Sequence, residues 1–177
     1  MGVSRTPVRE ALARLEQEGL VPASCRGAFV ARKTKSEILE MITVWAALES
    51  MAARLITENA TDEEIASLQK LCATVEDNTS RADIDGYSDL NIRFHQAIIA
   101  LSKSQLLATM TETLFIHTCS IRERTIGEND RAQRSIIDHM NIITALEDRD
   151  ADLAERLSRE HTLVLTAYVE KNVTYLD

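Results

Sequence analysis

Apolar residues recur at helical spacing from the start of the chain. Between Gly2 and Val21 they fall every three or four positions and form one stripe: Val8, Ala11, Leu12, Leu15 and Leu20. Ser4 and Thr6 are candidate N-caps, and Pro7 is tolerated in a first helical turn, where its missing N–H has no partner to lose. Gly19 is a natural stop. We therefore predict a short amphipathic helix in this segment.

The pattern changes directly after this helix. The stretch "VPASCRGAFVARK" is short and rich in small residues, and it contains two brief apolar runs, 21–23 and 28–31. These runs are typical of two short strands, with residues 24–27 as the turn. Gly27 would let the backbone approach a partner closely. A helix followed by a short hairpin matches the second half of a winged helix-turn-helix.

From Ser36 onward the spacing stays helical almost to the end. Ser36 is a candidate cap for the first helix of this part, and Thr61 with Glu64 has the spacing of a capping box. The amphipathic segments are separated by short polar connections and cover residues 36–60, 61–78, 83–102, 104–125, 129–150 and 151–172. Six such helices predict an all-α antiparallel bundle.

The composition fits one globular domain with a small addition. The chain has 177 residues, of which 45% are hydrophobic and 27% charged, so disorder is excluded as its main state. No apolar run is long enough to cross a membrane, and the charged N-terminus does not read as a signal peptide. The three cysteines are scattered, which favours a reduced, cytoplasmic setting.

Charge is divided unevenly along the chain. Residues 1–35 hold seven Lys or Arg and three Glu, which gives them a net charge of +4. Because the whole chain has a net charge of −8, the remaining residues carry −12. A basic head on an acidic body fits a nucleic-acid reader joined to a domain that DNA repels. Arg5, Thr6 and Arg9 place guanidiniums and a hydroxyl at one helix end, where they suit phosphates and guanine edges. A solvated basic face fits the same spacing equally well.

The first thirty residues resemble a known family. "VSRTPVREALARLEQEGLV" followed by "RGAFVA" closely resembles the GntR-type transcription regulators, and within them the FadR subgroup, whose sensing part is an all-helical FCD domain. The resemblance implies a recognition helix in the major groove that contacts DNA through Arg5, Thr6 and Arg9. It also implies a wing tip, Arg26 and Gly27, near the minor groove.

This resemblance divides the chain into two domains. Residues 1–34 would be a partial winged helix-turn-helix, because the family motif begins earlier, with two helices that brace the recognition helix. We therefore expect weak operator binding by these residues alone. Residues 35–177 would be the helical domain that binds an effector and forms a homodimer. The FCD resemblance runs through "WAALESMAARLITENATDEEIASLQKL", where Trp45 stands in place of a usual arginine. Any effector contact by that arginine would be absent.

Four histidines stand 22 residues apart, at His95, His117, His139 and His161, each on an apolar helix face. A lone histidine on such a face is usually a packed core residue. Several on separate helices of one bundle can instead share a metal ion, because imidazole is a common metal ligand. Asn91 precedes His95 by four residues, so their side chains share one face. Spacing alone leaves the packed and the metal-binding interpretations open.

The family resemblance favours the metal-binding interpretation of these histidines. Many FCD domains hold a divalent ion with an Asp, or less often an Asn, four residues before a histidine, and with two histidines on later helices. Asn91, His95, His139 and His161 match these positions, whereas His117 matches none. Zinc, nickel and manganese are all compatible. Three nitrogens and one oxygen would leave coordination positions open for a small carboxylate effector.

These observations predict a metabolite-responsive transcription repressor that binds operator DNA as a homodimer. Two alternatives remain at this point: a metal-dependent hydrolase and a purely structural dimerisation bundle. The hydrolase is the weaker of the two. The sequence has no HExxH, Gly-rich phosphate loop or GxSxG motif. Asp138 and Glu160 each adjoin a candidate ligand, and neighbours in sequence are expected to point to different helix faces.

Overall fold

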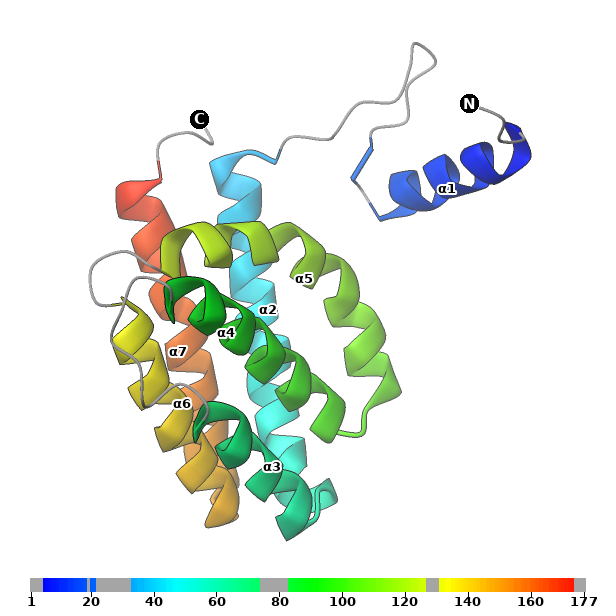
Figure 1. The fold of residues 1–177 in the computed structure, drawn as a ribbon. Helices are drawn as coiled ribbons and strands as arrows, with labels where there is room; N and C mark the ends of the chain where they lie inside the picture. The colour runs from blue at the N-terminus through cyan, green and yellow to red at the C-terminus, as the bar shows by residue number, and fades with distance from the viewer. Residues whose placement is uncertain (1–4, 19, 22–32, 74–82, 127–130, 174–177) are drawn as a thin grey trace.

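A computed structural model describes residues 5–18, 20–21, 33–73, 83–126 and 131–173. Within those ranges all regular structure is helical. The helices are α1 Arg5–Gln17, α2 Lys35–Asn59, α3 Asp62–Ala73, α4 Asp83–Leu101, α5 Gln105–Ile126, α6 Arg131–Glu147 and α7 Ala151–Asn172 (Figure 1). The six helices predicted after Ser36 are confirmed. The predicted hairpin lies almost entirely at 22–32, outside the described residues.

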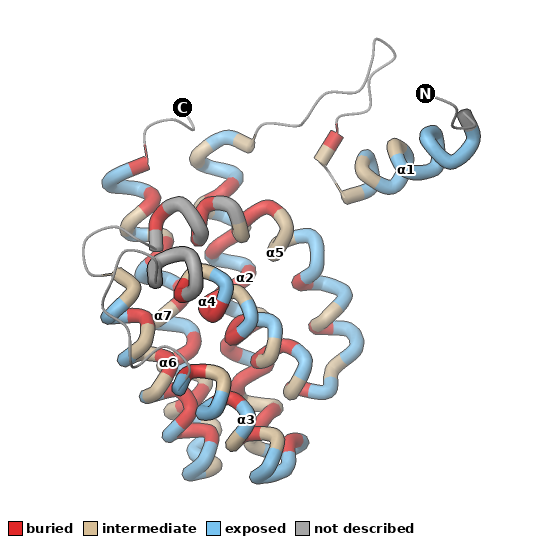
Figure 2. The backbone as a smooth tube through the Cα atoms, viewed as in Figure 1, coloured by how far each residue is buried: buried red, intermediate tan, exposed pale blue. Residues whose placement is uncertain are grey.

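Helix α2 is the central element of the bundle. It packs along α7 over most of its length and also contacts α4 and α5, while α3 lies against α4 and α6. The largest core side chains come from different helices, among them Trp45, Ile56, Phe94, Ile98 and Leu146. Removal of these apolar side chains from water is the main force that holds the helices together. Figure 2 shows the buried faces turned inward in each bundle helix.

Polar contacts show that α2 and α7 run antiparallel. Arg54, near the end of α2, pairs with Asp152 and Glu155 at the start of α7. Further back along α2, Glu49 accepts a hydrogen bond from Thr162, which lies later in α7, at 2.6 Å. Residues later in α7 therefore pair with residues earlier in α2, as two antiparallel helices require. This pairing places the middle of α7 beside the middle of α2.

The turn between α6 and α7 is tied to the end of α2. Arg149 takes a left-handed backbone conformation, with φ 57°, and its Nη1 donates to the carbonyl oxygens of Ile56, Thr57 and Ala60. These carbonyls lie at a helix C-terminus, where backbone donors run out, and only that of Ile56 also accepts a backbone N–H, from Ala60. The guanidinium also pairs with Asp62. Arg149 therefore fixes the start of α7 against the junction of α2 and α3.

The start of α2 differs from the sequence prediction. Thr34, and not the predicted Ser36, caps the helix, and Ser36 lies inside the first turn. Thr34 Oγ1 accepts from the backbone N–H of Glu37 at 3.3 Å, and Glu37 Oε2 accepts from the backbone N–H of Thr34 at 2.8 Å. Both threonine and serine have the right chemistry, and Glu37 selects Thr34 because it stands three residues later. The predicted Thr61 and Glu64 box is confirmed.

Helix α1 stands apart from the bundle in Figure 1, and most of its described side chains are exposed (Figure 2). It begins at Arg5, so Thr6 lies within the helix rather than at its cap. After α1, the carbonyl oxygen of Glu18 accepts a hydrogen bond from His117 Nε2 of α5, at 2.9 Å. Among the described helices, none is both long enough and apolar enough to cross a membrane.

Thr34→Ala should lower the free energy of unfolding by about 1 kcal/mol, because it removes the side-chain acceptor of the capping box. Ser36→Ala is the matched control and should change stability by less than about 0.5 kcal/mol, since Ser36 is exposed and does not cap α2. Urea unfolding followed by circular dichroism measures both. A larger loss for Ser36→Ala would assign the cap to Ser36 instead.

Candidate metal centre

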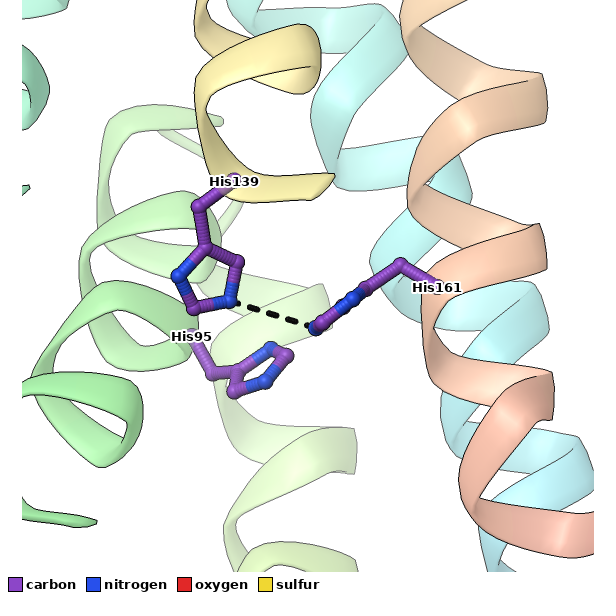
Figure 3. Close-up of side chains that lie close together, drawn as sticks. All are labelled: His95, His139 and His161. Atoms are coloured by element: carbon purple, nitrogen blue, oxygen red, sulfur yellow. Dashed lines mark hydrogen bonds between the residues drawn. The ribbon is translucent and has the colours of Figure 1, made fainter. Parts of the chain in front are cut away.

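Three of the four histidines converge inside the bundle. His95 comes from α4, His139 from α6 and His161 from α7, and their candidate ligand nitrogens all lie within 4.8 Å of one another (Figure 3). His139 Nε2 and His161 Nε2 are 3.2 Å apart. His95 and His139 are completely buried. The triad is therefore a cluster that can hold a metal ion.

A buried carboxylate orients His95. His95 Nδ1 is 2.5 Å from Glu49 Oε1, and the other carboxylate oxygen accepts from Thr162. Burial by itself would raise the pKa of Glu49, but His95, Arg122 and the hydrogen bonds lower it to about 2. The carboxylate is thus ionised and accepts the Nδ1 proton, which places the lone pair of His95 on Nε2, where it accepts a hydrogen bond from Arg122 Nη1 at 2.8 Å. Carboxylates commonly orient metal-binding histidines in this way.

A second carboxylate plays the same part for His161. His161 Nδ1 is 3.0 Å from Asp138 Oδ2, so the proton on Nδ1 is donated to Asp138 and the lone pair of Nε2 faces His139. The sequence predicts that Asp138 and its neighbour His139 point to different helix faces, but it does not reveal that Asp138 meets His161 of α7. Asp138 does leave the helix on a different face from His139, but α7 packs against α6 and brings His161 to that face.

The environment keeps the buried imidazoles neutral. Burial and the charge of Arg122 together lower the pKa of His95 to about 4, against the opposing effect of Glu49. Burial also sets the pKa of His139 well below its usual value, with His161 and His95 acting in the same direction. The His139 ring stacks on Phe94, with ring centroids 3.8 Å apart. Neutral imidazole is the form that binds metals, so these residues fit a divalent ion.

Arg122 of α5 is a further member of the site that sequence reasoning missed. It is 5% exposed, its Nη1 lies 2.8 Å from His95 Nε2, and its guanidinium lies over the Trp45 ring. Burial lowers the pKa of Arg122, and Glu49 opposes this shift. Trp45 stands where the resemblance implies an arginine, and α5 supplies a guanidinium beside its indole. Only the packing of α5 against α2 brings the two together.

A cavity of about 390 Å³ reaches one histidine of the triad, His161. Asn91, Arg122 and His161 contribute its buried lining, and Asn91 Oδ1 accepts a hydrogen bond from Ser135 Oγ at 3.4 Å. Asn91 therefore shares a cavity with His161, one helical turn before His95. The volume lies in the range of ordinary small-molecule sites.

The remaining predicted site residues lie elsewhere. His117 hydrogen-bonds to Glu18 and does not join the triad. Arg5 begins α1, and Thr6 and Arg9 lie exposed along the same helix. The two wing residues, Arg26 and Gly27, lie outside the described part of the chain.

Known proteins resemble the chain over nearly its whole length. A family model described as "FCD domain" matches residues 40–163, and one described as "Bacterial regulatory proteins, gntR family" matches residues 1–30. The HTH-type transcriptional regulator YdhC of Bacillus subtilis is 29% identical, covering 88% of this chain and 70% of that protein. The HTH-type transcriptional repressor RspR of Escherichia coli is 26% identical, covering 90% and 70%. The Nta operon transcriptional regulator of Aminobacter aminovorans is 32% identical, covering 85% and 70%.

A solved structure shares the fold. Escherichia coli McbR/YncC superimposes with a TM-score of 0.78 at 24% identity, covering 98% of this chain and 83% of that one.

Glu49→Gln should destabilise the metal-free protein by about 3 kcal/mol, because it leaves the buried guanidinium of Arg122 without its compensating carboxylate. Adding Arg122→Met should recover more than half of that loss, since the double variant removes both charges. Glu40→Gln, an exposed change on the same helix, is the control. Urea unfolding in the presence of a chelator measures all of these. Additive losses in the double variant would show that the two charges do not compensate each other.

Proposed function

Because the chain belongs to the GntR family of bacterial regulators and carries an FCD domain, we propose that it is a metabolite-responsive repressor. The family consists of transcription regulators, so the chain is not an enzyme and the alternative of a metal-dependent hydrolase is rejected. Repression is proposed because the relative RspR is a transcriptional repressor. The observation that carries the sensing function is the histidine triad beside a cavity.

Residues 1–34 are proposed as the DNA reader and residues 35–177 as the effector-binding and dimerisation domain. Arg5, Thr6 and Arg9 of α1 would contact operator DNA in the major groove, with Arg26 and Gly27 at the wing. The exposure of Arg9 and the +4 charge of residues 1–35 support this assignment. In a homodimer the two readers would sit at half-site spacing, in the cytoplasm where operator DNA is found.

The metal centre is proposed to hold one zinc, nickel or manganese ion through Asn91, His95, His139 and His161. Glu49 and Asp138 support this, because they place the lone pairs of two imidazoles on Nε2. A metal bound to His95 would have to displace Arg122 Nη1 from that nitrogen. A bound divalent ion supplies a Lewis-acidic centre that attracts an anionic group. Asn91 contributes no charge, so the ion would keep its full positive charge toward the cavity. A small carboxylate effector and the metal should therefore bind cooperatively.

Helix α5 is the proposed connection between the sensor and the reader. Arg122 lines the cavity, and His117 on the same helix donates to the carbonyl oxygen of Glu18, just after α1. A shift of α5 caused by an effector at Arg122 would move the support of α1. The effector regulates DNA binding only if it favours one arrangement of the readers over the other.

His95→Ala and His161→Ala should each abolish stoichiometric metal binding, because each removes one of three nitrogen ligands. His117→Ala is the matched control and should leave the metal content unchanged, while Asn91→Asp should raise metal affinity by adding a charged oxygen. Inductively coupled plasma mass spectrometry of protein purified without added metal measures the content. One ion per chain in both histidine variants would refute the proposed ligand set, and a metal-free wild-type protein would favour the structural bundle.

In a protein in which the two bracing helices of the family motif precede α1, Arg5→Ala and Arg9→Ala should each weaken binding to a site selected from random duplexes. The expected loss is about 1–3 kcal/mol if the side chains read base edges. Arg93→Ala, on an exposed face of α4, is the control. Fluorescence anisotropy on the selected site and on random DNA separates the roles. Equal losses of affinity on both DNAs would show that the arginines contact phosphates. No loss of affinity on either DNA would show that α1 is not part of the interface.

A further inference from the structure

We infer that Arg122 competes with a metal ion for His95, so that its guanidinium holds the ligand nitrogen when no ion is bound and leaves it when one binds. This inference rests on the proposed function, because it concerns the same metal centre. It goes further in giving Arg122 a role that is not that of a ligand. The side chain would set how tightly the site holds an ion.

His95 has one nitrogen to offer, and Arg122 occupies it. The Nδ1 proton of His95 is donated to Glu49 Oε1 at 2.5 Å, so the single lone pair of the neutral ring lies on Nε2. Arg122 Nη1 donates to this Nε2 at 2.8 Å. A metal ion would need the same lone pair, at about 2 Å from the nitrogen. The N–H of Arg122 and the ion therefore exclude each other at His95.

The other two rings of the triad are engaged with each other. His161 Nδ1 donates to Asp138, so His161 Nε2 is an acceptor, and His139 Nε2 donates to it at 3.2 Å (Figure 3). An ion held through all three Nε2 atoms would break this hydrogen bond as well as the one from Arg122. The ligand nitrogens are thus paired within the chain, and an ion has to compete with these pairs.

The guanidinium of Arg122 is held by few contacts. The hydrogen bond from Nη1 to His95 is its only one with the residues that the structure describes, because Nε and Nη2 are buried without an acceptor. Buried donors without an acceptor are costly, so this position is only weakly favoured over one nearer to water. Arg122 also lines the cavity of about 390 Å³, which can receive the side chain when it leaves His95.

Glu49 can compensate either cation. Both of its oxygens are engaged, one with His95 and one with Thr162, and neither bond involves Arg122. The carboxylate would therefore stay in place when the guanidinium leaves. A divalent ion and a guanidinium a few ångströms apart repel each other strongly in a buried site, so a single carboxylate favours one cation at a time. Binding of the ion and departure of Arg122 are thus coupled.

This exchange has two measurable consequences. The apparent metal affinity is reduced by the fraction of molecules in which Arg122 has left His95, so a preference of about 10:1 for the closed arrangement lowers it about tenfold. The chain also has a single tryptophan, Trp45, and the Arg122 guanidinium lies 5.7 Å from its ring centroid. Departure of Arg122 should therefore shift the tryptophan emission.

The test uses zinc and the full chain, stripped with a chelator and then titrated in competition with a chromophoric chelator. Arg122→Met should bind zinc about tenfold more tightly than the wild type, because the competing donor is gone. Arg134→Gln is the matched control. It removes an exposed cation that lines the same cavity and should change zinc affinity by less than about twofold. Zinc should shift Trp45 emission in the wild type and not in Arg122→Met.

Equal zinc affinity in the wild type and in Arg122→Met would overturn the inference. An emission shift of the same size in both proteins would do so too, because it would then come from the ion and not from the guanidinium. A gain in affinity without an emission shift in the wild type would also count against it, since the loss of a nearby positive charge would explain the gain.

Stopped-flow fluorescence of the wild type carries the test even if Arg122→Met impairs folding. The rate of the emission change should level off as zinc is raised, because departure of Arg122 becomes limiting. A rate that rises in proportion to zinc throughout would contradict the exchange.

The same titrations separate this inference from the proposed metal centre. Zinc bound by Arg122→Met but not by the wild type would support competition by Arg122 and refute a metal-holding site in the wild type. Zinc bound equally well by both would retain the metal centre and reject the role of Arg122. Zinc bound by neither would reject both.

Discussion

The buried carboxylate of Glu49 is the interaction on which the centre of this bundle depends. It lies on α2, accepts from His95 of α4 and Thr162 of α7, and compensates the guanidinium of Arg122 on α5. Four helices therefore meet at one ionised group. An isolated charge at this depth would be prohibitively costly, so the helices that supply its partners must pack in one register.

Such a centre gives up stability for a defined geometry. Apolar residues of the same volume would often make as stable a core, yet they could not hold imidazole nitrogens toward one another. Here the carboxylates Glu49 and Asp138 fix which nitrogen of each ring carries the proton. The stacking of His139 on Phe94 limits rotation of the third ring. The apolar core around α2 stabilises this arrangement, and the hydrogen bonds of Glu49 and Asp138 determine how the imidazole rings are oriented.

The same packing connects the cavity to the N-terminal helix. Arg122 and His117 belong to one continuous helix, so the buried site and the contact with Glu18 cannot move independently without bending α5. Helix α1 has few other attachments, and most of its described side chains face solvent. In the proposed function, a ligand that displaces α5 would alter the support of α1 and in this way influence the proposed DNA reader.

The sequence by itself determined the helical elements and most of the candidate ligands. Apolar spacing of 3.6 residues located the six bundle helices, the capping box at Thr61 marked one start correctly, and the family resemblance selected the three histidines that converge. Spacing reports only which residues share a face of one helix. It could not show that Asp138 reaches His161, or that Arg122 lies beside Trp45 and His95, because these pairs join different helices. Only the tertiary structure decided them, since the packing of α5, α6 and α7 sets which faces meet.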